Sequence, residues 1–122
     1  MSYRIVHYIN QFYAGKGGED KADYKPESVP TPVGPGNEIA RLLKELGGEA
    51  EIVGTVICGD SYYGENIETA RAACLGMIEA LKPDLLIAGP AFNSGAAYDY
   101  TPSGGTGAAV RTLIALAHAL AN

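Results

Sequence analysis

The sequence has no tryptophan, only two cysteines, and fewer basic than acidic residues, nine against fourteen. No apolar run approaches about 18 residues and the N-terminus shows no signal-peptide pattern, so we predict neither a transmembrane helix nor a secreted protein. Cys58 and Cys74 lack metal-binding or redox spacing, so we interpret them as small buried residues in a reducing cytoplasm. The net charge of −5 excludes the basic face that nucleic acids and anionic membranes require, and we predict neither as a partner.

What remains is an apolar, glycine-rich chain. Hydrophobic residues make up 47% of 122 residues, which is enough for one core and predicts one domain over residues 1–122. Sixteen glycines and seven prolines without a repeat indicate many tight loops. One stretch is especially rich in both: residues 10–35, directly after the first predicted strand, are interpreted as a long loop.

Hydrophobic periodicity predicts alternating strands and helices. The expected strands are residues 3–9, 51–58 and 84–89, and the expected helices are residues 37–46, 66–82 and 106–121. Helical crossovers between short apolar strands give a parallel sheet, so the fold class is a small flavodoxin-like or Rossmann-like three-layer α/β domain with a short parallel sheet. Residues 97–101 are a candidate edge strand. The helix at 106–121 is apolar almost all round, which predicts a homo-oligomer through this C-terminal helix.

Polar residues follow the ends of the predicted strands, where ligands bind in open parallel sheets. The candidate ligand-binding residues are Asn10, Gln11, Gly17, Gly18, Asp60, Asn93 and Ser94. The amide and carboxylate side chains would orient a small polar ligand, and glycine N–H groups would hold an anionic part. Because the long loop leaves from this edge, we expect residues 12–25 to form a mobile lid over the ligand.

Each candidate has a structural alternative. Asn10 and Gln11 can satisfy backbone groups at a strand end, Asp60-Ser61 can cap a helix, and Asn93 can be a turn residue. The glycines can provide flexibility alone, and His7, in the middle of a strand, is interpreted as a core histidine. The sequence shows no Ser-His-Asp order and no other catalytic nucleophile, so the catalytic residues stay unassigned. It also shows no cluster of metal ligands, and we predict no metal or cofactor.

Four segments resemble the N-terminal part of the selenoprotein B component of the glycine, sarcosine and betaine reductases. The resemblance runs from about Tyr3 to Gly95 and weakens afterwards, and its segments are VHYINQFYAGKGGEDKADYKP, PVGPG, GGEAEIVGTVICGDSYYGEN and KPDLLIAGPAFNSG. It implies an oxidoreductase of anaerobic bacteria that reductively deaminates a small amino acid or its N-methylated relatives. In that family a selenocysteine in a much later region attacks the substrate, and this sequence carries neither that region nor a Cys-x-x-Cys pair.

Three functions therefore stay open. The first is a ligand-binding domain descended from reductase component B but lacking the selenocysteine region. The second is a stand-alone protein that binds or sequesters a nucleotide-like ligand by stacking on aromatic residues near the strand ends; these are Phe12, Tyr13, Tyr62, Tyr63, Phe92 and Tyr98. The third is a subunit of a multi-chain reductase whose partner subunits carry the selenol.

Overall fold

The computed structural model describes residues 3–89 of the chain. Several predictions lie outside these residues. They are the edge strand at 97–101, the apolar helix at 106–121 with its oligomer contact, and the candidate ligand residues Asn93 and Ser94.

The sheet has four strands in the order β2-β3-β1-β4. The central strand β1 (Tyr3–Ile9) runs parallel to β3 (Ala50–Ile57) on one side and to β4 (Leu85–Ala88) on the other. The short β2 (Glu27–Val29) joins β3 in antiparallel orientation at one edge. The predicted α/β domain is thus confirmed, with a mostly parallel sheet that becomes mixed through β2.

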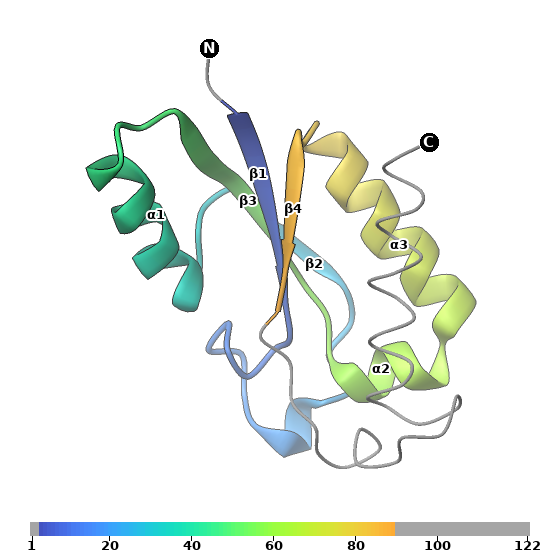
Figure 1. Cartoon of the computed structure of the whole chain (residues 1–122). Helices are drawn as coiled ribbons and strands as arrows, with labels where there is room; N and C mark the ends of the chain where they lie inside the picture. Colours follow the sequence, from blue (N-terminus) through green and yellow to red (C-terminus); the bar gives the residue numbers. More distant parts are fainter. Residues whose placement is uncertain (1–2, 90–122) are drawn as a thin grey trace.

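Helices lie on both faces of the sheet, which gives the three predicted layers (Figure 1). α1 (Pro35–Glu45) lies on one side, and α2 (Asp60–Glu65) and α3 (Ile67–Ala80) lie on the other. α1 begins at a proline, whose fixed φ suits the first helical position. α2 was not predicted, because its six residues are too few to show helical periodicity. No helix within residues 3–89 has the length and apolar character needed to cross a membrane.

The segment 10–35 is not one continuous loop. It contains a single 3-10 turn, η1 (Glu19–Lys21), and the strand β2, which sequence analysis missed. β2 has only three residues and lies between Pro26 and Pro30, so it shows no alternation of its own. It forms because Glu27 and Val29 pair with the end of β3, which is a tertiary contact.

The core lies on both sides of β1. Val6 and Tyr8 point to the α3 side, where they belong to one buried cluster with Cys74 and Ile78. Ile9 belongs to a second, smaller cluster on the other side. Apolar burial on both faces is typical of a parallel strand and explains the near-continuous apolar run of residues 5–9. The burial continues past the end of β1, where the candidate site begins.

Candidate functional site

The carboxyl ends of the three parallel strands meet at one edge of the sheet (Figure 1). β1 is followed by Asn10 and Gln11, β3 leads through Gly59 into Asp60 at the start of α2, and β4 is followed by Gly89. We define these five residues as the carboxyl edge. Right-handed crossovers from a parallel sheet bring such distant residues together.

Asn10 and Asp60 are in direct contact although 50 residues separate them. Asn10 Nδ2 donates a hydrogen bond of 3.2 Å to Asp60 Oδ2, and Asn10 Oδ1 accepts one of 3.2 Å from the backbone N–H of Tyr13. Asn10 is only 1% exposed. Its amide therefore satisfies a backbone group, which is the structural alternative, and it also holds the half-buried carboxylate of Asp60 at the edge.

Gln11 is buried beside Asn10 and links two parts of the following loop. Its Nε2 donates a hydrogen bond of 3.0 Å to the backbone oxygen of Gly18. Its Oε1 is buried and has no hydrogen-bond partner among the described residues. Unsatisfied buried acceptors are rare in native proteins, so this oxygen is a place where a donor from water or a ligand is expected.

The glycines of the loop differ from one another. Gly15 and Gly17 have φ of 74° and 119°, in the region that favours glycine, whereas Gly18 is not among the residues with positive φ. The carbonyl of Gly18 accepts from both Gln11 and the backbone N–H of Lys21. Gly17 is exposed and Gly18 half-buried, so the predicted glycine cradle faces the surface next to the carboxyl edge.

The second half of the loop is tied to the start of α2. The backbone oxygen of Ala22 accepts hydrogen bonds from the N–H groups of Ser61 (2.9 Å) and Tyr62 (3.1 Å), and the N–H of Gly59 donates to Tyr24 (2.8 Å). No side chain makes a capping hydrogen bond at the start of α2. Sequence analysis considered Asp60-Ser61 as a helix cap, but here a backbone carbonyl provides the cap instead. Sequence analysis missed Ala22, because any residue type can provide a capping backbone carbonyl.

His7 is a fully buried core histidine, as interpreted from the sequence. Its Nε2 lies 2.6 Å from the backbone oxygen of Gly89. Since a carbonyl only accepts, Nε2 carries the proton and donates it. Burial lowers the pKa of His7 and so favours the neutral ring, and the hydrogen bond to Gly89 offsets this in part. This contact fixes the end of β4 against β1.

The two cysteines lie inside the core on the α3 side and are both free. The hydrogen bond with Cys74 and desolvation raise the pKa of the Cys58 thiol far above its usual value. Both thiols are fully buried, so neither cysteine is accessible to attack a substrate. We find no group of three or more potential metal-ligating side chains in residues 3–89.

We predict that neither cysteine reacts measurably with dithionitrobenzoate in the native protein at pH 8, because both thiols are buried and Cys58 resists deprotonation. Absorbance at 412 nm should rise by two equivalents only after unfolding in guanidinium, which is the positive control. Fast reaction of one equivalent in buffer would show an accessible thiolate and reopen the question of a cysteine nucleophile.

Comparison with known proteins identifies the family. The model for glycine/sarcosine/betaine reductase selenoprotein B matches residues 2–115, which extends past Gly95. The sarcosine reductase complex component B subunit beta of Peptoclostridium acidaminophilum is 56% identical over 92 residues, 75% of this chain and 20% of that protein. The glycine reductase complex component B subunit gamma of Carboxydothermus hydrogenoformans is 55% identical over 93 residues, 76% of this chain and 21% of that protein.

A shorter stretch of the chain is similar to a different kind of protein. A probable cytosol aminopeptidase of Streptomyces griseus is 74% identical over 31 residues, which is 25% of this chain but only 6% of that protein. No solved structure matches the chain. The chain spans about a fifth of the length of the reductase subunits that it matches. With a family model covering nearly the whole sequence, the chain belongs to the glycine/sarcosine/betaine reductase selenoprotein B family.

Proposed function

We propose that this domain binds a small polar ligand with a cationic amine at the carboxyl edge of the sheet, as the substrate-binding part of a reductase component B. The observation that carries this is the half-buried Asp60 carboxylate held by the buried amide of Asn10. A carboxylate fixed in a partly desolvated place favours a positive group next to it.

Other groups near Asp60 suit the rest of such a ligand. The free Oε1 of Gln11 is an acceptor for an ammonium N–H, provided that the loop opens enough to admit one. Gly17 and Gly18 are proposed to offer backbone N–H groups to a carboxylate, and Asn93 and Ser94, outside the described residues, are proposed to complete the site. Since Ala22 and Tyr24 are tied to Gly59 and α2, we propose the mobile lid for residues 12–18 only, a narrower segment than sequence analysis expected. Its opening must break the hydrogen bonds that hold Tyr13, Lys16 and Gly18 to Asn10 and Gln11.

Binding without chemistry is the role we assign to this chain. Cys58 and Cys74 are both buried in the core, where neither thiol is exposed to a ligand. The two similar proteins named above are subunits of reductase complexes. This supports, for the present chain, the third function considered above, a part of a multi-chain reductase in which another subunit supplies the selenol.

The test is calorimetric titration with glycine, sarcosine and betaine. We expect Asp60→Asn to weaken binding of all three at least tenfold, which corresponds to about 1.4 kcal/mol. Glu79→Gln removes the same charge from an exposed position of α3 and should leave affinity unchanged. Betaine has no N–H donor, so it should also bind more weakly than glycine if Gln11 accepts a hydrogen bond. Equal affinities in wild type and Asp60→Asn would contradict the proposal.

A nucleotide-like ligand is the alternative, and the structure offers it less support. Among the aromatic candidates, Tyr63 is 2% exposed and packs in the core, while Phe12 is 48% exposed next to the carboxyl edge. The Phe12 and Tyr13 rings are in edge contact at 5.4 Å. Of the four aromatic candidates within residues 3–89, only Phe12 is exposed, and one exposed ring is a small platform for a base. Adding a nucleotide panel to the same titration separates the two functions.

A further inference from the structure

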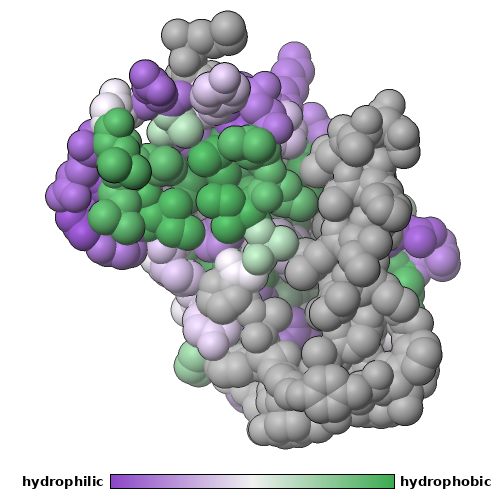
Figure 2. Space-filling model, in the orientation of Figure 1, coloured by the Kyte–Doolittle hydropathy of each residue, from purple (hydrophilic) through white to green (hydrophobic). Residues whose placement is uncertain are grey.

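An apolar surface remains open between α1 and β4. Leu42, Leu46 and Leu85 are 43%, 82% and 54% exposed. Figure 2 shows a broad hydrophobic area on the α1 side of the molecule. We call Leu42, Leu46, Leu85 and Ile87 the α1–β4 face. Large contiguous apolar patches are uncommon on monomeric proteins and mark interaction sites.

Strand register explains why this face is open. Leu85 pairs with Ile5 and Ile87 pairs with His7, so both side chains of β4 point to the same side of the sheet as their partners in β1. α1 packs over β3, which lies two strands away from β4. Among residues 3–89, no second helix lies beside α1 to cover β4, although a parallel sheet is normally covered on both faces.

β4 also lacks the features that protect an edge strand. Its four residues, Leu-Leu-Ile-Ala, include no charged residue and no proline, and its register against β1 is regular. In the described part of the chain its outer edge has no partner strand. Natural edge strands usually carry charges, bulges or prolines that prevent pairing, so an unprotected apolar edge favours association.

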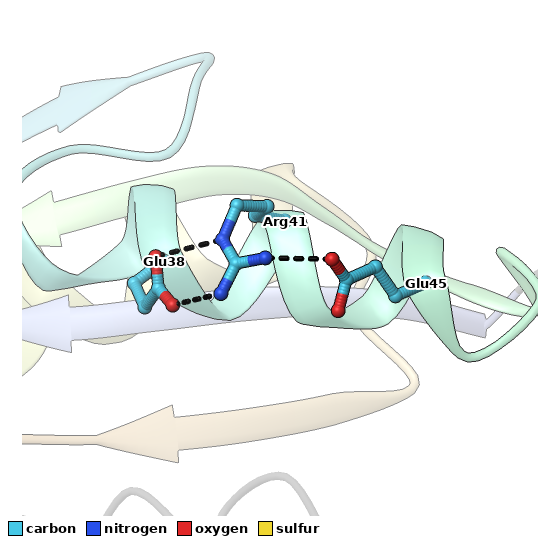
Figure 3. Close-up of polar contacts among 3 residues, drawn as sticks. All are labelled: Glu38, Arg41 and Glu45. Atoms are coloured by element: carbon cyan, nitrogen blue, oxygen red, sulfur yellow. Dashed lines mark hydrogen bonds and ion pairs between the residues drawn. The ribbon is translucent and has the colours of Figure 1, made fainter.

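The charges next to the face are compensated within α1. Arg41 Nε donates to Glu38 Oε2 at 3.0 Å and Arg41 Nη1 donates to Glu45 Oε1 at 2.7 Å (Figure 3). With Lys44, α1 carries two carboxylates and two cations and is neutral as a whole. Although the chain has a net charge of −5, the α1 helices of two copies can therefore approach without net charge repulsion.

We propose that the α1–β4 face is the contact between two copies of this chain related by a two-fold axis. A surface that packs against the α1–β4 face must be apolar and uncharged. The α1–β4 face of a second copy meets both conditions, and a two-fold interface uses the same patch on both subunits. In such a dimer, α1 of each copy covers the open part of β4 in the other. This interface differs from the C-terminal helix contact expected from the sequence and is independent of the proposed ligand.

The oligomeric state of the full chain tests the proposal. Sedimentation velocity should show a dimer at micromolar concentration, and Leu42→Glu and Leu85→Glu should each raise the dissociation constant at least tenfold. Ala72→Glu introduces the same charge on exposed α3 and should leave the constant unchanged. Circular dichroism melting confirms that each variant is folded. A monomeric wild type, or a dimer indifferent to both leucine substitutions, would overturn the proposal.

Cysteine labelling identifies what covers the face. Cys58 and Cys74 are buried, so Leu42→Cys adds the one thiol expected to be accessible in residues 3–89. Its rate of reaction with iodoacetamide should rise severalfold when the protein is diluted, because dissociation exposes it. Protection that does not change with concentration would mean that the same chain covers the face, and fast labelling at every concentration would mean that nothing does. Either result contradicts a dimer through this face.

Discussion

Replacing Gly59 by alanine should lower the free energy of unfolding by about 1–3 kcal/mol, the range seen for overpacked sites. A Cβ at Gly59 would lie 2.1 Å from the backbone oxygen of Ala22 and 2.6 Å from the backbone nitrogen of Tyr24. Both atoms belong to the backbone, so no rotamer change relieves the contact. The φ of Gly59 is −73°, which any residue adopts, so the loss comes from steric conflict alone.

The conflict acts on the contact that ties the loop to α2. To admit the methyl group, residues 22–24 must move away, and Ala22 then no longer accepts from the N–H groups of Ser61 and Tyr62. Uncapped N–H groups at a helix start carry a further loss. Urea unfolding followed by circular dichroism measures the change, and amide hydrogen exchange at Ser61 and Tyr62 should become faster than in wild type.

Gly76→Ala is the matched control. Gly76 lies inside α3, is exposed, and a Cβ there would meet no atom within 4 Å. Alanine should stabilise this helix by about 0.5–1 kcal/mol, because glycine loses more backbone entropy on folding. Opposite signs for the same substitution at the two glycines would support the close approach at Gly59. If Gly59→Ala leaves the free energy of unfolding unchanged, residues 22–24 can move away from α2 without cost.

The strands and long helices could be predicted because their residues repeat with a clear period. β1, β3 and β4 have apolar runs, and α1 and α3, which are eleven and fourteen residues long, carry apolar side chains at helical spacing. β2 and α2 could not be predicted in this way. The three residues of β2, Glu27–Val29, form a strand only because they pair with β3. α2 begins where the backbone oxygen of Ala22 accepts hydrogen bonds from its first N–H groups. Such elements depend on distant backbone atoms, which residue types do not encode.

The carboxyl edge was predictable in position but not in detail. Parallel topology alone indicated that Asn10 and Asp60 lie at the same edge of the sheet, beyond the carboxyl ends of their strands. That Asn10 would use its whole amide within the protein, while Gln11 would keep an unpartnered oxygen, depends on the turn from Tyr13 to Gly18. This turn requires positive φ at two glycines, and sequence shows where that is allowed but not where it occurs.

Asn10→Ala should destabilise the domain by about 1–3 kcal/mol, as expected when a buried side chain loses hydrogen bonds that include one to a carboxylate. The substitution removes the contacts to Asp60 and to the N–H of Tyr13 at a position that is 1% exposed. Asn66→Ala is the control, because Asn66 also makes a side-chain hydrogen bond, to Tyr62, but is exposed. Although Asn66 is the N-cap of α3, its side chain makes no capping hydrogen bond there. Surface changes of this kind usually stay within about 0.5 kcal/mol. Equal losses at the two asparagines would contradict a special role of burial at Asn10.

Asn10→Asp separates the two contacts through pH. The new carboxylate still accepts from Tyr13, but its other oxygen would lie about 3 Å from Asp60 Oδ2, as the amide does now. Two carboxylates at this distance share one proton, so the pKa of the pair rises in the folded state above its unfolded value near 4. A raised folded pKa means that stability is present at low pH and is lost as pH rises through that value. The variant should therefore approach wild type in urea unfolding at pH 4 and fall well below it at pH 7, whereas a pH-independent difference would show that Asn10 and Asp60 do not meet.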